Sequence, residues 1–173
     1  SGSHGICVYG RSGNYNTGLK VINNQFVEGI EYGIALNYSD APEVSGNTIA
    51  LKYERPYTAT INKGIFLNYC KNSMKITKNR VVLPYDEGTA LELLYCVGTA
   101  DQKGAIENNY LYTFSGNGIK MNNSPYQNIF YNTHFNEGTY NNSYSLSASS
   151  SNFTTAKNNN FCNYANGKSV IIS

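Results

Sequence analysis

Apolar and polar residues alternate with period two over short stretches, and the same arrangement recurs along the chain. One frame places a small or aliphatic residue three positions before an Asn and, in five of six copies, a large apolar residue two positions after it; His134 is the exception. The copies centre on Asn24, Asn47, Asn79, Asn109, Asn132 and Asn159. Period-two alternation is typical of strands with one buried face, so each copy predicts two strands joined at an Asn.

A second frame, Gly-Ile-x-Leu and its variants, alternates with the first. It starts at Gly5, Gly33, Gly64, Ala90, Gly118 and Tyr144, and begins again at Val170. No segment shows the 3.6-residue period of a helix, and a repeat of this length with short strands predicts a solenoid whose coils stack as parallel sheets. We expect each repeated Asn to adopt the left-handed conformation at the bend and to hydrogen-bond to the Asn of the next coil.

Together the two frames resemble the right-handed parallel β-helix proteins of the pectate-lyase-like superfamily. The resemblance covers nearly the whole chain and implies the handedness. We therefore expect an all-β, right-handed parallel β-helix of about six coils, each with 26–31 residues and three short strands, forming a single domain over residues 1–173. Both ends resemble interrupted coils, which predicts a fragment of a longer chain whose ends are covered by flanking domains or by partner subunits, as in a homotrimer.

Stacking the coils predicts which side chains are neighbours. The inward column of the first strand is expected to contain Ile6, Ile34, Ile65, Leu91 and Ile119, followed by Val8, Leu36, Leu67, Leu93 and Met121. Tyr38, Tyr69 and Tyr95 share one position and should stack as rings. Cys70 and Cys96 share the next, where a disulfide and a pair of free thiols both remain open.

The composition of the chain limits the classes of partner that it can bind. The formal charge is only +2 and no apolar run is long enough to span a membrane, so neither nucleic acid nor a membrane span is predicted. Charged residues make up only 14% of the chain, whereas Asn and the 16 Tyr are abundant. Tyrosine rings cover the apolar C–H faces of sugars and Asn amides bind sugar hydroxyls, so the composition favours a polysaccharide or glycan partner.

The expected glycan site lies on the outward face of the first strand, beside the loops that follow the third strand. The candidate binding residues are Tyr9, Asn37, Phe66, Asn68, Lys120 and Asn122 on the strands, with Arg55 and Tyr57 from the longest loop. Ser145 and Ser147 are expected to continue the rows of Lys120 and Asn122. Glycoside hydrolysis requires two carboxylates, and the candidates are Glu92 on the floor with Glu54 and Asp86 from loops. Glu92 beside Lys120 also fits a cross-strand ion pair.

No metal site is predicted, because no Cys/His spacing resembles a known one; calcium is the one ion that the resemblance admits. His134 is expected in an inward position with a hydrogen-bond partner, and the basic run Lys71, Lys75, Lys78 and Arg80 as a solvated face.

We thus predict a carbohydrate-engaging β-helix segment of an extracellular, cell-surface or virion (phage-tail) protein. Whether it is an enzyme or a binder is open; the resemblance implies a polysaccharide lyase or a glycoside hydrolase if it is an enzyme. The alternative is a non-catalytic spacer or adhesin stalk.

Overall fold

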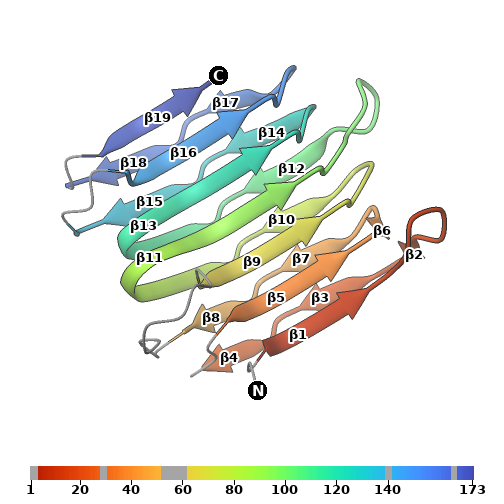
Figure 1. The fold of residues 1–173 in the computed structure, drawn as a ribbon, viewed down its shortest axis with the longest axis horizontal. Helices are drawn as coiled ribbons and strands as arrows, with labels where there is room; N and C mark the ends of the chain where they lie inside the picture. Colours follow the sequence, from red (N-terminus) through yellow and green to blue (C-terminus); the bar gives the residue numbers. More distant parts are fainter. Residues whose placement is uncertain (1–3, 28–30, 52–61, 139–141, 165–166) are drawn as a thin grey trace.

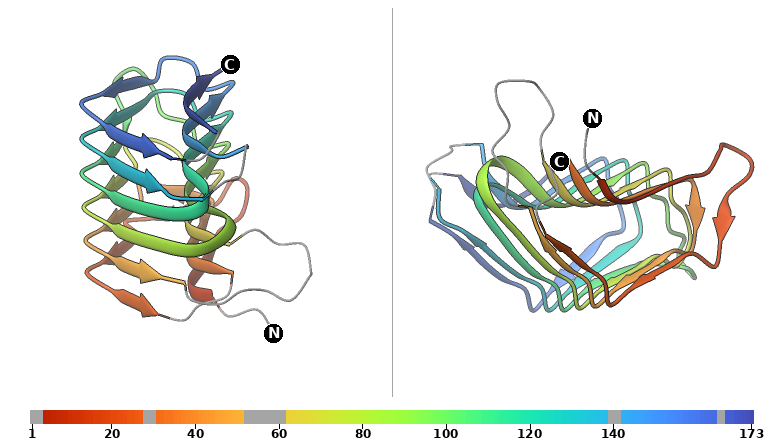
Figure 2. Two further views of the ribbon diagram at one scale, coloured as in Figure 1. Left: turned by 90° about the vertical axis from the view of Figure 1, so that its left-hand side faces the viewer. Right: turned by 90° about the horizontal axis from the view of Figure 1, so that it is seen from below.

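The computed structural model describes residues 4–27, 31–51, 62–138, 142–164 and 167–173; for His4 and residues 85–87 it describes the backbone alone. The described residues contain strands and no helix. Ribbons of successive coils lie on one another from the N-terminal to the C-terminal end (Figure 1). Viewed from below, the same ribbons superpose into one elongated outline whose walls are the stacked strands (Figure 2). The predicted parallel β-helix is confirmed.

Three stacks of parallel strands form the walls. The first contains β1 (His4–Tyr9), β5 (Tyr32–Asn37), β9 (Lys63–Asn68), β11 (Arg80–Leu94), β13 (Tyr110–Asn122), β16 (Tyr144–Ser149) and β19 (Lys168–Ile172). The second contains β3 (Lys20–Ile22), β7 (Glu43–Ser45), β10 (Lys75–Thr77), β12 (Gly104–Glu107), β14 (Gln127–Phe130) and β17 (Thr155–Lys157). The third contains β4 (Gln25–Val27), β8 (Thr48–Ala50), the first residues of β11 and β13, β15 (Thr133–Asn136) and β18 (Asn160–Asn163). A short pair, β2 (Asn16–Thr17) and β6 (Ser39–Asp40), lies at one turn.

The prediction of three short strands in every coil is wrong in the middle of the solenoid. β11 and β13 each run without a break from the third wall into the first. The loop expected around Asp86 is therefore strand backbone, paired with Ser115 of β13. Two register shifts on either side of Asp86 bend the paired strands, and such irregularities let a strand turn a corner without ending.

The predicted inward columns are confirmed. Ile34 pairs with Ile65, Ile65 with Leu91, and Leu91 with Ile119, and all four side chains are fully buried. Gly33 and Gly64, the second residues of β5 and β9, are glycines because each backbone lies against the next coil: a Cβ on either would overlap both a carbonyl oxygen and a core side chain. Burial of each aliphatic side chain contributes about 1.5–3 kcal/mol, which makes these columns the main source of stability.

The register assigned to the sixth coil is wrong by two residues. Ile119 pairs with Leu146, so Ser147 and not Ser145 continues the row of Lys120. Ser145 is fully buried and takes the place that Gly118 holds in the coil before. The missing Gly concealed the true start of this strand in the sequence.

The predicted asparagine ladder is confirmed. In each step, the Nδ2 of one Asn donates to the Oδ1 of the next at 2.9–3.1 Å, and the backbone N–H of the first Asn donates to the same oxygen. From the second coil onward, Nδ2 also donates to a carbonyl of the preceding coil, as Asn79 does to Val44 O at 2.9 Å. The ladder residues therefore satisfy backbone groups at a bend where no strand partner is available.

The left-handed residue is not the ladder Asn, as expected, but the residue before it. The residues with positive φ at this bend are Asn23, Gly46, Lys78, Asn108, Tyr131 and Asn158. A non-glycine residue pays a conformational penalty there. The hydrogen bonds of the Asn that follows offset this penalty, which explains why Lys78 and Tyr131 are accepted.

A second ladder, which the sequence analysis missed, runs along the turn between the first and second walls. Its members are Ser39, Cys70, Cys96, Ser124 and Ser151, and each follows a left-handed residue: Tyr38, Tyr69, Tyr95, Asn123 or Ser150. The backbone N–H of Cys96 donates to Ser124 Oγ at 3.0 Å, and that of Ser124 donates to Ser151 Oγ at 3.1 Å. The predicted ring stack of Tyr38, Tyr69 and Tyr95, with centroids 4.9 Å apart, lies beside this ladder.

His134 is fully buried and both ring nitrogens are hydrogen-bonded, as expected. Nε2 lies 2.9 Å from Thr113 Oγ1, and Nδ1 lies 2.9 Å from Ser145 Oγ. Because the Thr113 hydroxyl donates its proton to Gly116 O, Nε2 must carry the hydrogen and Nδ1 must accept one from Ser145. Burial lowers the pKa of His134 to about 3 from its ordinary 6.5, so the ring is neutral.

Replacing a central ladder residue should destabilise the fold much more than replacing the first one. Asn79→Ala removes the acceptor of two Asn47 donors and leaves Val44 O without its donor. We expect a loss of about 3 kcal/mol in the free energy of unfolding, measured in urea. Asn24→Ala removes no acceptor used by another coil and should cost about 1 kcal/mol. Equal losses would contradict a ladder that acts through its buried acceptors.

Stability should fall in acid because of His134. The unfolded chain binds a proton below pH 6.5 whereas the native ring does not until about pH 3, so stability present above pH 6.5 is lost as the pH falls between those values. From pH 7 to pH 5 the loss attributable to this ring is about 2 kcal/mol. It is measured as the difference between the wild type and His134→Gln, in which carboxylate titrations cancel. The same pH dependence in both proteins would contradict a neutral buried ring.

Candidate functional site

The outward face of the first wall carries the predicted site. Strand pairing places Cys7, Ala35, Phe66, Glu92, Lys120 and Ser147 in one row and Tyr9, Asn37, Asn68, Leu94, Asn122 and Ser149 in the next. We call these two rows the outer face. The structure thus brings together the six binding candidates that lie on strands and the candidate acid Glu92, with Ser149 in the place expected for Ser147.

A compact cluster forms the middle of the outer face. Glu92 lies 2.7 Å from Lys63 Nζ and 3.9 Å from Lys120 Nζ. Lys63 Nζ in turn lies 4.0 Å from the centre of the Phe66 ring, and that ring stacks on Tyr32 at 5.6 Å. The predicted pair of Glu92 with Lys120 exists, but the nearer partner is Lys63, which the sequence analysis missed.

Lys63 was missed because it precedes the repeated frame and does not belong to it. β9 begins at Lys63, directly before the inward Gly64 and Ile65, so its side chain lies outside the core. Tyr32 holds the same position in β5 and pairs with Lys63. A comparison of the residue before each Gly-Ile would have placed these two side chains next to Phe66.

The Glu92 carboxylate is held between two ammonium groups. Its side chain is only 9% exposed, whereas that of Lys120 is 44% exposed. One carboxylate beside two lysines leaves the cluster with a net positive charge, and the more solvent-accessible cation is Lys120.

Amide side chains extend the outer face beside the cluster. Asn68 Nδ2 donates to Asn37 Oδ1 at 3.0 Å, and Asn122 Oδ1 accepts from Asn123 at 2.8 Å. The buried Oδ1 of Asn68 has no hydrogen-bond donor among the described residues. A buried acceptor of this kind is costly unless a ligand or a water supplies a donor. At the first coil, Tyr9 is 73% exposed.

Several predicted site residues cannot be placed on this face. Glu54, Arg55 and Tyr57 lie outside the described residues, and for Asp86 only the backbone is described. Another acidic side chain, that of Glu137, accepts a hydrogen bond from the Tyr112 hydroxyl at 2.7 Å. This bond raises the pKa of Tyr112 to about 12, because the phenol would lose it on deprotonation.

The turn beside the second ladder forms a separate aromatic edge. Tyr15 packs edge-on against Tyr38, and Lys71 Nζ lies 4.2 Å from the centre of the Tyr15 ring. Lys71 also pairs with Asp40 at 3.3 Å. Lys75, Lys78 and Arg80, the rest of the basic run, are exposed, which is the arrangement expected of a solvated face.

Cys70 and Cys96 are free thiols, which answers the question that the sequence left open. Cys96 Sγ donates to Leu67 O at 3.3 Å and Cys70 Sγ to Leu36 O at 3.7 Å. Burial raises the pKa of the Cys96 thiol well above its ordinary value, so this sulfur is protonated at neutral pH. Within the described part of the chain, no three His, Cys, Asp or Glu side chains form a group that would hold a metal ion.

Comparison with protein-family models places part of the chain in a known family. The sequence model of one family, described as "Periplasmic copper-binding protein (NosD)", matches residues 1–93, just over half of the chain. Neither the curated proteins nor the solved structures yield a match. No helix among the described residues is long and apolar enough to cross a membrane. The family's periplasmic description agrees with the expectation of an exported protein, and its parallel β-helix fits a right-handed solenoid of the kind described above. The chain therefore belongs to the NosD family.

Proposed function

We propose that this chain binds a glycan on its outer face. The observation that carries the proposal is the make-up of this face, where the Asn37–Asn68 amide pair, the accessible ammonium group of Lys120 and the stacked rings of Tyr32 and Phe66 lie side by side. Sugar sites combine amides for the hydroxyls with rings for the apolar C–H faces.

Each part of the outer face has a distinct role in this proposal. Lys63, Glu92 and Phe66 are fixed by their mutual contacts and form the floor. Asn68 and Asn122 hydrogen-bond to the ligand. Lys120 attracts an acidic or a polar group, because Glu92 lies at the long distance of 3.9 Å and does not fully neutralise it.

The proposal is for binding, not for catalysis. A hydrolase needs a second carboxylate facing the same bond as Glu92, and the candidates Glu54 and Asp86 have no described side chain. The periplasmic description of the family supports an exported protein. The resemblance to pectate-lyase-like proteins extends the proposal to the cell surface or a virion, where glycans are encountered.

The alternative is a rigid spacer without a ligand. The outer side of the second wall favours it, because this side carries alternating charges such as the Lys20–Glu43 pair at 3.4 Å and has the character of a solvated surface. The Asn ladder and the hydrogen bonds that join Cys96, Ser124 and Ser151 would give such a spacer its stiffness.

A second candidate ligand is copper, which the description of the family names. The donor set that suits it best is the thiol pair of Cys70 and Cys96, since soft sulfur ligands select Cu(I) over harder ions. When bound, the ion would add a centre for metal transfer or electron transfer to a protein whose other surfaces are polar and aromatic.

Substitutions on the outer face should weaken glycan binding on an array. We expect Asn68→Ala and Lys120→Ala to weaken the best hit by about tenfold each, which corresponds to about 1.4 kcal/mol. Phe66→Ala should weaken it more, because the Lys63–Glu92 pair loses the ring on which it rests.

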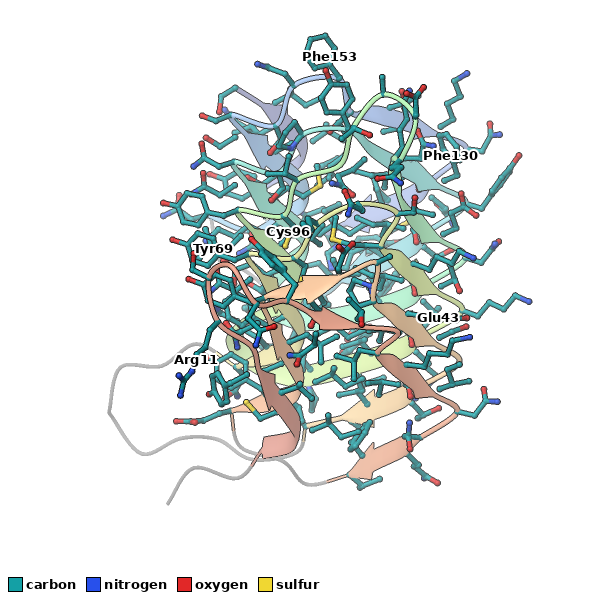
Figure 3. All side chains as sticks on the ribbon, turned by 90° about the vertical axis from the view of Figure 1, so that its right-hand side faces the viewer. Arg11, Glu43, Tyr69, Cys96, Phe130 and Phe153 are labelled. Carbon is teal, nitrogen blue, oxygen red and sulfur yellow. The ribbon has the colours of Figure 1, made fainter. Side chains whose placement is uncertain are left out.

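Phe130→Ala is the matched control for Phe66→Ala. Phe130 lies on the outer side of the second wall, on the same side of the molecule as Glu43 and on the opposite side from Tyr69 in the side-chain view (Figure 3). Its removal should leave the array profile unchanged. An array without hits, or hits that are insensitive to all three outer-face changes, would favour the spacer over the glycan-binding protein.

A further inference from the structure

The two buried thiols lie on consecutive coils at a point where the backbones are hydrogen-bonded to each other. The N–H of Tyr69 donates to Leu94 O, and the N–H of Val97 donates to Cys70 O. Lys71 and Val97, the residues that follow the two cysteines, form a parallel bridge. Because paired parallel strands are about 4.8 Å apart, Cys70 and Cys96 are direct neighbours with side chains on the same, inward side.

The ladder alone does not require sulfur at these two positions. Ser39, Ser124 and Ser151 fill the equivalent positions of other coils. Ser124 accepts the backbone N–H of Cys96 and donates to Asn122 O at 3.0 Å, so a hydroxyl performs both hydrogen-bonding tasks. Cysteine is the weaker donor and acceptor. Two thiols, side by side, thus replace a residue that serves the ladder at least as well.

The pair is buried in the apolar core. Cys70 and Cys96 belong to the core cluster of aliphatic side chains. Water is excluded from both thiols, which are 1% and 0% exposed. A water-free site with two thiol donors suits Cu(I), whereas Mg²⁺, Ca²⁺ and Mn²⁺ prefer oxygen ligands.

We infer that Cys70 and Cys96 together bind one Cu(I) ion. This inference rests on the copper candidate proposed above and assigns its residues. Each sulfur forms one bond to copper and releases its proton to solvent, so two S–H bonds break and two S–Cu bonds form. The ion enters and stays as Cu(I), and no oxidant or reductant is consumed. The hydrogen bonds from the thiols to Leu36 O and Leu67 O are given up in exchange.

The pair lies at the turn between the first and second walls. Tyr69 and Tyr95, which directly precede the two cysteines, are 38% and 40% exposed, and Val97 is 45% exposed. Figure 3 looks onto this turn edge and labels Cys96 beside Tyr69. Solvent thus reaches residues adjacent to the cysteines in sequence, although the thiols themselves are buried.

The test is a titration of the reduced, oxygen-free protein with Cu(I) in competition with a chromogenic Cu(I) chelator. We expect one Cu(I) per chain and a thiolate-to-copper charge-transfer absorption in the ultraviolet. The double variant Cys70→Ser/Cys96→Ser should lose both signals, with at least a hundredfold weaker binding. Because Ser is the residue of the same ladder in neighbouring coils, this variant should keep its strand circular dichroism and cooperative unfolding.

The matched control is Cys7→Ser/Cys162→Ser, which removes the two partly exposed thiols. It should bind Cu(I) as the wild type does. Unchanged binding by Cys70→Ser/Cys96→Ser, or loss of binding in the control, would overturn the assignment of this pair while leaving copper as a ligand of the chain. A wild type that binds neither Cu(I) nor Cu(II) would overturn both the site and the copper candidate. Neither result bears on glycan binding, which uses the outer face.

Discussion

The hydrogen bonds between stacked Asn side chains fix the position of each coil on the next. An Asn at this bend satisfies two backbone groups that have no strand partner and accepts two donors from the preceding coil. A shift of one residue in any coil would leave these buried groups unpaired, at about 1–3 kcal/mol each. Apolar side chains would tolerate such a shift more easily, because burial has no direction. The ladder therefore sets the register, and the aliphatic columns supply most of the stability.

A fixed register matters for function, because residues at equivalent positions of successive coils become neighbours in space. Lys63, Glu92 and Lys120 belong to three successive coils and meet on the outer face. Cys70 and Cys96 meet inside the adjoining turn for the same reason. The two surfaces are chemically independent, since one is polar and outward and the other is a pair of soft donors in the core. A single repeated scaffold thus presents two candidate sites whose occupancy can be measured separately.

The strained residues of the solenoid also depend on the ladders. Tyr38, Tyr69 and Tyr95 adopt a left-handed conformation that is unfavourable for a bulky side chain. Their rings stack at 4.9 Å, and each is followed by a ladder residue that anchors the turn. The same logic applies to Lys78, which precedes Asn79. At these turns, contacts with the adjacent coils outweigh the unfavourable left-handed conformation of the residue itself.

The sequence by itself determined the parallel β-helix, the Asn ladder, the inward columns and the tyrosine stack. All of these depend on residues that recur at a fixed spacing, and a repeat makes neighbours of equivalent positions. It did not reveal the Lys63–Glu92 pair, the Ser/Cys ladder, the continuous strands β11 and β13 or the true register of Ser145. These features involve residues that are chemically unlike their counterparts in other coils, so no pattern links them. Only the tertiary structure decided them. Contact between unlike residues depends on where each coil bends and on which backbone groups still lack a hydrogen-bond partner.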